Sequence, residues 1–252
     1  MNLDLEGKVA LVTGSARDIG RETALAFAAE GATVAVNYNR SANAAGSVVG
    51  EITENGGKAK AYQADVADLE SVQAMTEAIV GDFGRIDVLV NNAGYVEPRR
   101  FLDTGPEEWK RQIDVGLYGV IHCCSAVGAR MVEQGGGRIV NLAGDSARIG
   151  GKALSVTTSA RGGVLSLTKS LAQEFGPSGV TVNAVALGYV ETTHTDPNWL
   201  EKNREKIVRQ YPMRRIGTPE DVAPAIVFLA SGGASWITGQ ILSISGGYSM
   251  VG

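Results

Sequence analysis

Short apolar runs of buried-strand type alternate with amphipathic stretches along this chain. Buried parallel strands are nearly continuous in apolar and β-branched residues, whereas amphipathic helices repeat apolar residues with a helical period. Seven such runs joined by helices predict one doubly wound α/β sheet with parallel strands and right-handed crossovers. The predicted strands are Val9–Val12, Thr33–Asn37, Ala59–Ala64, Ile86–Val90, Arg138–Leu142, Val180–Val185 and Ile241–Ile244. The predicted helices include Arg21–Glu30, Leu69–Phe83, Pro106–Val132 and Pro219–Leu229.

The composition fits a single domain over residues 1–252. The chain is 44% hydrophobic and 20% charged, and it contains no internal repeat or Pro/Ser-rich linker. A net charge of −4 argues against nucleic acid or an anionic membrane as the main partner. The first residues are too polar for a signal peptide, and we find no apolar run long enough to span a bilayer. We therefore expect a cytoplasmic protein.

Cysteine and histidine are too scarce to predict a metal site. Cys123 and Cys124 are adjacent in a predicted helix, where a disulfide between them would be strained. We interpret both as reduced core residues. His122 and His194 are the only histidines, so we expect no metal cluster.

A glycine-containing turn follows the first predicted strand. It runs from Thr13 to Gly20 and carries Gly14 before the helix begins. Glycines allow a pyrophosphate to approach a helix N-terminus closely, and the free N–H groups there favour anions. Many such turns bind nothing, so the pattern alone is a weak indication of a dinucleotide site.

A series of further motifs runs through the chain. They are Thr13-Gly14-x-x-x-x-Ile19-Gly20, Asp65-Val66, Asn91-Asn92-Ala93-Gly94, Gly119, Arg138-Ile139-Val140-Asn141, Val182-Asn183-Ala184-Val185, Thr218-Pro219-Glu220-Asp221-Val222-Ala223, Phe228-Leu229-Ala230-Ser231, Thr238-Gly239 and Gly246-Gly247. In order and spacing, these motifs resemble the short-chain dehydrogenase/reductase superfamily over essentially the whole chain. The resemblance implies a Rossmann-type domain that binds NAD(H) or NADP(H).

The resemblance also implies which residues contact the cofactor. They are Gly14, Ile19 and Gly20 at the pyrophosphate, Asp65 and Val66 at the adenine, and Asn92, Ala93 and Gly94 along the ribose and nicotinamide. No acidic residue ends the second predicted strand to bind a ribose 2′-hydroxyl, so Arg17 and Arg40 suit the 2′-phosphate of NADP(H). The alternative is that both are solvated surface arginines.

One residue of the glycine-containing turn departs from the family pattern. Asp18 stands where the family has a glycine. A carboxylate beside a pyrophosphate is repulsive unless it turns outward, and at this position it could instead cap the helix. We interpret Asp18 as a helix cap. We expect dinucleotide binding to be absent or weak, with NADP(H) preferred over NAD(H).

The four catalytic positions implied by the resemblance all carry other residues. Active members use Asn, Ser, Tyr and Lys, whereas this chain has Gly116, Gly144, Thr157 and Arg161. No tyrosine in the chain is followed four residues later by a lysine, so a shifted alignment does not restore the Tyr–Lys pair. A threonine hydroxyl ionises far less readily than a phenol, and a planar guanidinium differs from a compact ammonium. We therefore predict no catalytic residue at these positions.

Asp145 and Ser146 are the nearest possible replacements. A carboxylate near a hydride-transfer site could act as a base, and a serine hydroxyl could hydrogen-bond a carbonyl. The alternative, which we favour, is that both side chains satisfy backbone groups in a glycine-rich loop.

These departures predict a non-catalytic subunit, or pseudoenzyme, that assembles with an active paralogue in an NAD(P)-dependent alcohol or ketone dehydrogenase. The expected assembly is a hetero-tetramer or a homo-oligomer. Inactive–active pairs are known in the superfamily, for example in the dehydrogenase of the benzylsuccinate pathway, which acts on a CoA thioester. The chain resembles that kind of inactive subunit. Two alternatives remain open: an enzyme of altered mechanism (an isomerase, a lyase or an atypical ketoreductase), and a sensor that binds a dinucleotide without turning it over.

Overall fold

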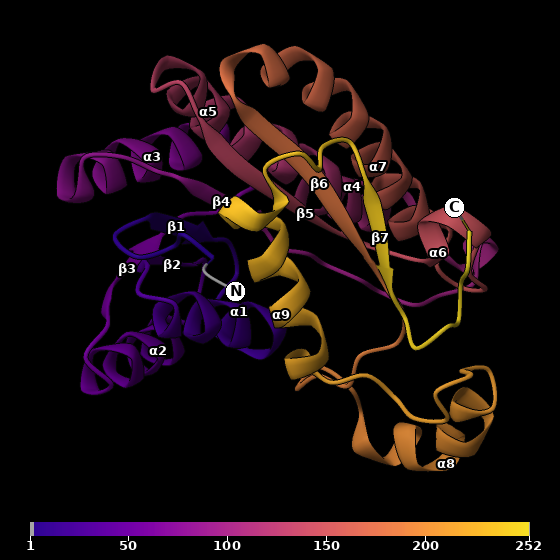
Figure 1. Ribbon diagram of the computed structural model, residues 1–252. Coiled ribbons are helices and arrows are strands. Elements are labelled where there is room, and N and C mark those ends of the chain that lie inside the picture. Colours follow the sequence, from indigo (N-terminus) through magenta and orange to yellow (C-terminus); the bar gives the residue numbers. More distant parts are fainter. Residues whose placement is uncertain (1–2, 252) are drawn as a thin grey trace.

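The strands of the protein form one sheet between two layers of helices in the computed structural model, which describes residues 3–251 (Figure 1). Neighbouring strands all pair in parallel, in the order β3-β2-β1-β4-β5-β6-β7. This arrangement confirms the predicted doubly wound, seven-stranded α/β fold. Residues 1–2 and 252 of the predicted domain lie outside the described residues.

The strand register brings the carboxyl ends of the strands to one edge of the sheet. Val12 pairs with Val36 on one side and Val90 on the other. Gly144 pairs with Leu187, which pairs in turn with Ile244. The turns that follow these strands therefore meet, as expected for the ligand-binding edge of an open α/β sheet. The strands are β1 (Val9–Val12), β2 (Thr33–Tyr38), β3 (Lys58–Gln63), β4 (Val88–Asn91), β5 (Gly137–Gly144), β6 (Val180–Leu187) and β7 (Ile241–Ile244).

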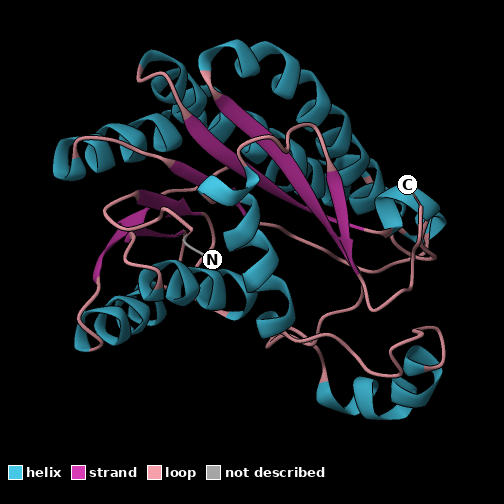
Figure 2. Ribbon diagram, viewed as in Figure 1, coloured by secondary structure: helices cyan, strands magenta, loops and turns pink. Residues whose placement is uncertain are grey.

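The helices cover both faces of the sheet, except that α8 projects away from it (Figures 1 and 2). One face is covered by α1, α2 and α9 and the other by α3, α5 and α7. The helices are α1 (Asp18–Ala29), α2 (Ala42–Glu54), α3 (Leu69–Phe83), α4 (Pro106–Ile113), α5 (Gly119–Glu133), α6 (Ser146–Ile149), α7 (Ser155–Phe175), α8 (Pro197–Val208) and α9 (Pro219–Leu229).

Each helical layer buries an apolar cluster against the sheet. Phe27 of α1 and Ile226 of α9 are fully buried on one side, and Ile79 of α3 and Val164 of α7 are fully buried on the other. Full burial of side chains of this size stabilises the fold by about 1.5–3 kcal/mol each. The sheet edge that carries the turns is thus fixed by packing on both faces.

The predicted helix Pro106–Val132 is interrupted where the site begins. The structure shows α4, a π-helical turn at Asp114–Tyr118, and then α5. Gly116 and Gly119 lie at this interruption, and glycine weakens regular helical hydrogen bonding. By length and composition alone, Pro106–Glu133 could cross a membrane, contrary to our expectation from the sequence. Its α5 part instead packs against α3, α7, β4 and β5.

The two cysteines are buried with free thiols, as expected. Burial raises the pKa of the Cys124 thiol to about 12, so the thiolate form is scarce at neutral pH. Among residues 3–251, no group of three or more His, Cys, Asp or Glu side chains is arranged to hold a metal ion.

Candidate functional site

The turn between β1 and α1 presents free backbone N–H groups at a helix N-terminus. Gly14 adopts a φ of 62°, and its N–H donates to the Asn37 side-chain oxygen at 3.0 Å. Within the described residues, the N–H groups of Asp18, Ile19 and Gly20 have no hydrogen-bond acceptor. Free donors and the helix dipole favour an anion at this point, so the turn fits the pyrophosphate of a dinucleotide.

Close backbone packing joins this turn to the end of β4. A Cβ at Gly20 would lie 2.5 Å from both the Asn92 side-chain nitrogen and the Gly14 carbonyl oxygen, so only glycine fits there. The Asn92 amide donates to the carbonyl oxygens of Thr13 and Gly14 at 2.8 and 3.1 Å. The Thr13 hydroxyl accepts from the N–H groups of Asn92 and Ala93 at 3.0 Å each. The structure therefore brings together two of the segments predicted to contact a cofactor.

The predicted adenine residues lie at the same sheet edge, directly after β3. Asp65 Oδ1 accepts from the Ala67 N–H at 3.0 Å, and the Asp65 N–H donates to Ser71 Oγ at 3.1 Å. The Val66 carbonyl oxygen lies 2.9 Å from His122 Nδ1 of α5. These bonds fix the loop after β3, and its contact with an adenine remains a prediction.

The arginines predicted to hold a 2′-phosphate are both exposed. Arg17 precedes α1 and its Nε lies 3.9 Å from Asp18 Oδ2, while Arg40 lies in the loop after β2. The Gly14 N–H bonds to the side chain of Asn37 near the end of β2, so the β1–α1 turn is joined to the strand that leads into the Arg40 loop. Neither guanidinium donates a hydrogen bond to another described residue, so both remain available to a ligand.

Asp18 does not cap α1, contrary to our interpretation of the sequence. Arg17 occupies the N-cap position, and no side chain caps the helix. Asp18 has a φ of 51°, in the left-handed region that favours glycine. Its carboxylate accepts from the N–H and the hydroxyl of Thr193 at 2.7 and 2.9 Å. The carboxylate therefore bonds to the segment after β6 rather than to the N-terminus of its own helix.

The four positions predicted to lack catalytic residues lie on β5, in the π-helical turn and on α7. Gly144 is the last residue of β5, and Gly116 lies in the π-helical turn, where a Cβ would be 3.5 Å from Ala160 Cβ of α7. Thr157 is buried in the first turn of α7. Arg161 lies one turn further along the same helix.

Arg161 is a cation without a counter-ion. Its Nη1 donates to the Leu142 carbonyl oxygen of β5 at 2.6 Å, and its Nη2 lies where a Cβ of Gly94 would be. No carboxylate within residues 3–251 pairs with this guanidinium. Burial lowers the pKa of Arg161 to about 10, which leaves the group charged at neutral pH. A partly buried, unpaired cation favours the arrival of an anion or an oxyanion.

Ser146 places a hydroxyl beside Gly144. A Cβ at Gly144 would lie 3.3 Å from Ser146 Oγ. This hydroxyl has no hydrogen-bond partner in the described chain. The glycine at the end of β5 thus has a serine hydroxyl next to it, supplied from the first residue of α6.

Asp145 is buried and belongs to a polar chain that reaches the C-terminal segment. Its Oδ1 accepts from Ser243 Oγ at 2.7 Å, and Ser243 Oγ accepts from Arg148 Nη1 at 2.9 Å. Arg148 Nη2 also donates to the Val251 carbonyl oxygen. The Asp145 and Ser146 side chains therefore do not bond to backbone groups of their own loop, which was the role that we favoured from the sequence.

Two residues of this site were missed by sequence reasoning. Thr193 bonds to Asp18 across 175 residues, and Ser243 bonds to Asp145 across 98 residues. No local pattern signals either pair, because the contacts exist only once the sheet edge is assembled. The β6 and β7 strand signals were the only available indication that these segments end near the site.

Comparisons with known proteins agree with this geometry. Residues 14–249 match a family model described as enoyl-(acyl carrier protein) reductase. The chain is 43% identical to a 3-oxoacyl-[acyl-carrier-protein] reductase of Synechocystis, covering 98% of each chain. It is 37% identical to the (2S)-[(R)-hydroxy(phenyl)methyl]succinyl-CoA dehydrogenase subunit BbsD of Thauera aromatica, covering 98% of this chain and 99% of the relative. A solved short-chain type dehydrogenase/reductase from Mycobacterium marinum superposes with a TM-score of 0.93 at 36% identity, covering 99% of this chain and 98% of that one.

These findings overturn two expectations drawn from the sequence. Relatives named as reductases over nearly the full chain indicate an active reductase, so the pseudoenzyme interpretation is wrong. The same relatives point to NAD(P)H binding, so the expectation of absent or weak binding is also wrong. The predicted hetero-tetramer with an active paralogue gains no support from them.

Proposed function

This chain belongs to the short-chain dehydrogenase/reductase superfamily, and we propose that it uses NAD(P)H to reduce the ketone of a 3-oxoacyl thioester. The names of two relatives support this substrate class, because one specifies a 3-oxoacyl group on acyl carrier protein and the other a succinyl-CoA derivative. The observation that carries the proposal is the unpaired guanidinium of Arg161 at the end of β5. It offers a positive charge at the sheet edge where the predicted cofactor residues also meet.

The residues around the β1–α1 turn would hold the dinucleotide. We propose the contacts implied by the family resemblance, supported by the free N–H groups at the start of α1. When bound, NAD(P)H supplies the hydride. The proposed contacts are Gly14, Ile19 and Gly20 for the pyrophosphate, Asp65 and Val66 for the adenine, Asn92, Ala93 and Gly94 for the ribose and nicotinamide, and Arg17 and Arg40 for a 2′-phosphate.

Arg161 and Ser146 would perform the functions of the four family catalytic residues, Asn, Ser, Tyr and Lys, that this chain lacks. As the ketone carbon gains hydride, its oxygen gains negative charge, and donors aimed at that oxygen lower the barrier. Arg161 supplies N–H donors and a full charge, and Ser146 supplies an unpaired hydroxyl at the end of the same strand. The Ser146 hydroxyl would hydrogen-bond the alkoxide, and solvent water would supply the proton that completes the alcohol, leaving a hydroxide that the buffer neutralises. In this mechanism Gly116, Gly144 and Thr157 carry no chemical role.

The direct test is turnover by the purified chain alone. With NADPH and acetoacetyl-CoA, a small 3-oxoacyl thioester, we expect NADPH absorbance to fall without any added protein. We also propose a homo-oligomer, which light scattering on the purified chain would detect, while the cytoplasmic location stays a prediction. NADPH binding without turnover on this substrate or on a 3-oxoacyl carrier protein would contradict the proposed reductase.

Arg17 and Arg40 should set the preference for NADPH over NADH. Replacing either by alanine should weaken NADPH binding by about tenfold, roughly 1.4 kcal/mol, because one charge-assisted phosphate contact is lost. NADH binding should change little, since NADH lacks the 2′-phosphate. Fluorescence titration with both dinucleotides measures the ratio, and Arg100→Ala, another exposed arginine, serves as the control. Equal loss for both dinucleotides would mean that the arginines are only solvated surface residues.

A further inference from the structure

The segment after β6 is hydrogen-bonded to the β1–α1 turn through a single residue of that turn, Asp18. We propose that Asp18 and Thr193 form a latch that keeps residues 191–196 closed over this turn, and that a dinucleotide must open the latch to enter or leave. Asp18 and Thr193 are then positioning residues for cofactor exchange. The proposal goes beyond the reductase activity, since it concerns how the cofactor site opens.

The hydrogen bonds of this segment show how it is held. Both donors of Thr193, its N–H and its hydroxyl, bond to the Asp18 carboxylate at 2.7 and 2.9 Å. Within residues 3–251, these are the only hydrogen bonds that join residues 191–208 to residues 3–187. In Figure 1, α8, which continues the segment, projects away from the sheet.

The base of the segment is anchored independently of Asp18. The Tyr189 N–H donates to the buried Tyr211 hydroxyl at 2.7 Å. Gly217 donates to the Tyr189 carbonyl oxygen at 3.1 Å, and the Glu191 N–H donates to the Gly217 carbonyl oxygen at 2.9 Å. The Tyr189 hydroxyl also donates to Thr195 Oγ1 at 3.4 Å, so loss of the latch should free the tip from the β1–α1 turn while its attachment to the base stays intact.

The backbone and charge of Asp18 also favour a switching role. Its φ of 51° is one that glycine adopts without strain, so the carboxylate is retained at a conformational cost. The carboxylate lies on the first residue of α1, whose free N–H groups fit a pyrophosphate. An incoming pyrophosphate repels this carboxylate and offers Thr193 alternative acceptor oxygens. Both effects would break the latch as the dinucleotide enters.

Hydrogen exchange on the ligand-free protein tests the latch without any cofactor. In Asp18→Gly, amide exchange in peptides covering residues 188–196 should accelerate by about tenfold or more, because two charge-assisted bonds are lost. Thr193→Val should accelerate exchange less, since the N–H bond remains. Thr193→Ser keeps both donors and should exchange at the wild-type rate. Glu201→Gln removes an exposed charge from α8 and should change nothing. Unchanged exchange in Asp18→Gly would refute the latch.

Stopped-flow fluorescence with NADPH tests the role of the latch in cofactor exchange. Both association and dissociation should be about tenfold faster in Asp18→Gly, and faster to a smaller degree in Thr193→Val. Faster hydrogen exchange with unchanged NADPH rates would refute the gating role. Slower NADPH association would also refute the gating role, because the bonds between Asp18 and Thr193 would then be needed to form the binding site rather than to close it. Neither assay uses a 3-oxoacyl substrate, so these outcomes are independent of whether the proposed reductase activity is found.

Discussion

Replacing Arg161 by methionine should lower kcat for 3-oxoacyl thioester reduction by about 10²–10³-fold, the usual effect of losing one donor to a developing oxyanion. KM should change little, because the ketone oxygen carries its full charge only in the transition state. Steady-state kinetics with acetoacetyl-CoA and NADPH measure both constants. Ser146→Ala should lower kcat in the same manner by about 10²-fold, as expected for loss of a second donor to the developing oxyanion.

The stability of the Arg161 variant separates a chemical role from a structural one. Arg161 has no counter-ion in the described chain, and burial disfavours its charge. A methionine of similar length removes this unpaired charge, so the melting temperature should stay the same or rise. Arg161→Lys keeps a cation and should retain more activity than Arg161→Met. Ser159→Ala, at an exposed position on α7, serves as the control, and loss of activity that follows loss of stability would contradict the proposed role.

The fold was predictable because its signals are local. Runs such as Val180–Val185 carry the apolar pattern of a buried strand, and the structure extends that run only to Leu187. The π-helical turn at Asp114–Tyr118 was not predicted, because the apolar period continues through it while the backbone hydrogen bonding changes. Membership of the superfamily was predictable for the same reason, since its motifs are short and ordered along the chain.

The contacts of the site were not predictable where they join segments that are distant in the sequence. Matching positions one by one named Ser146 as a nearby replacement for the hydroxyl that Gly144 lacks, but could not show that Ser146 Oγ lies 3.3 Å from where a Cβ of Gly144 would be. Asp18 was expected to cap its own helix, yet its carboxylate bonds to Thr193, 175 residues away. A missing side chain at a family position therefore does not establish a missing function when a neighbouring residue can place the same group nearby.

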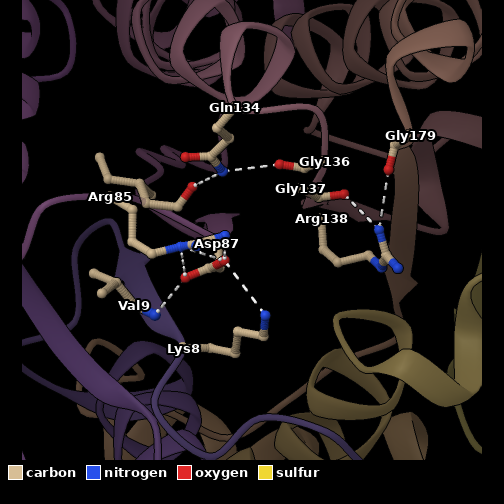
Figure 3. A network of polar contacts seen from close by, with 10 residues as sticks. Lys8, Val9, Arg85, Asp87, Gln134, Gly136, Gly137, Arg138 and Gly179 are labelled. Atoms are coloured by element: carbon tan, nitrogen blue, oxygen red, sulfur yellow. Dashed lines mark hydrogen bonds and ion pairs between the residues drawn. The ribbon is translucent and has the colours of Figure 1, made fainter.

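Replacing Asp87 by alanine should produce the largest loss of stability among the variants considered. Asp87 is 6% exposed and lies at the opposite edge of the sheet from the site, where β1 and β4 begin (Figure 3). Its Oδ2 accepts from the buried Val9 N–H at 3.0 Å and from Arg85 Nε at 2.9 Å, and its Oδ1 lies 3.8 Å from Lys8 Nζ. Removal leaves a buried backbone donor unpaired, and the charge-assisted bonds are lost with it. The expected decrease in the free energy of unfolding is about 2–4 kcal/mol.

Urea unfolding of three variants distinguishes the buried acceptor from the ion pairs around it. Asp87→Asn keeps an oxygen for the Val9 N–H and should lose only about half as much stability as Asp87→Ala. Asp82→Ala also removes a carboxylate, which pairs with the exposed Lys60 and accepts from the Tyr62 hydroxyl at 2.7 Å, but it leaves no buried backbone donor unpaired and should cost less stability than Asp87→Ala. NADPH affinity should be unchanged in all three, because none of these residues is near the β1–α1 turn. If Asp82→Ala and Asp87→Ala were equally destabilised, the buried bond to Val9 would not be what makes Asp87 important.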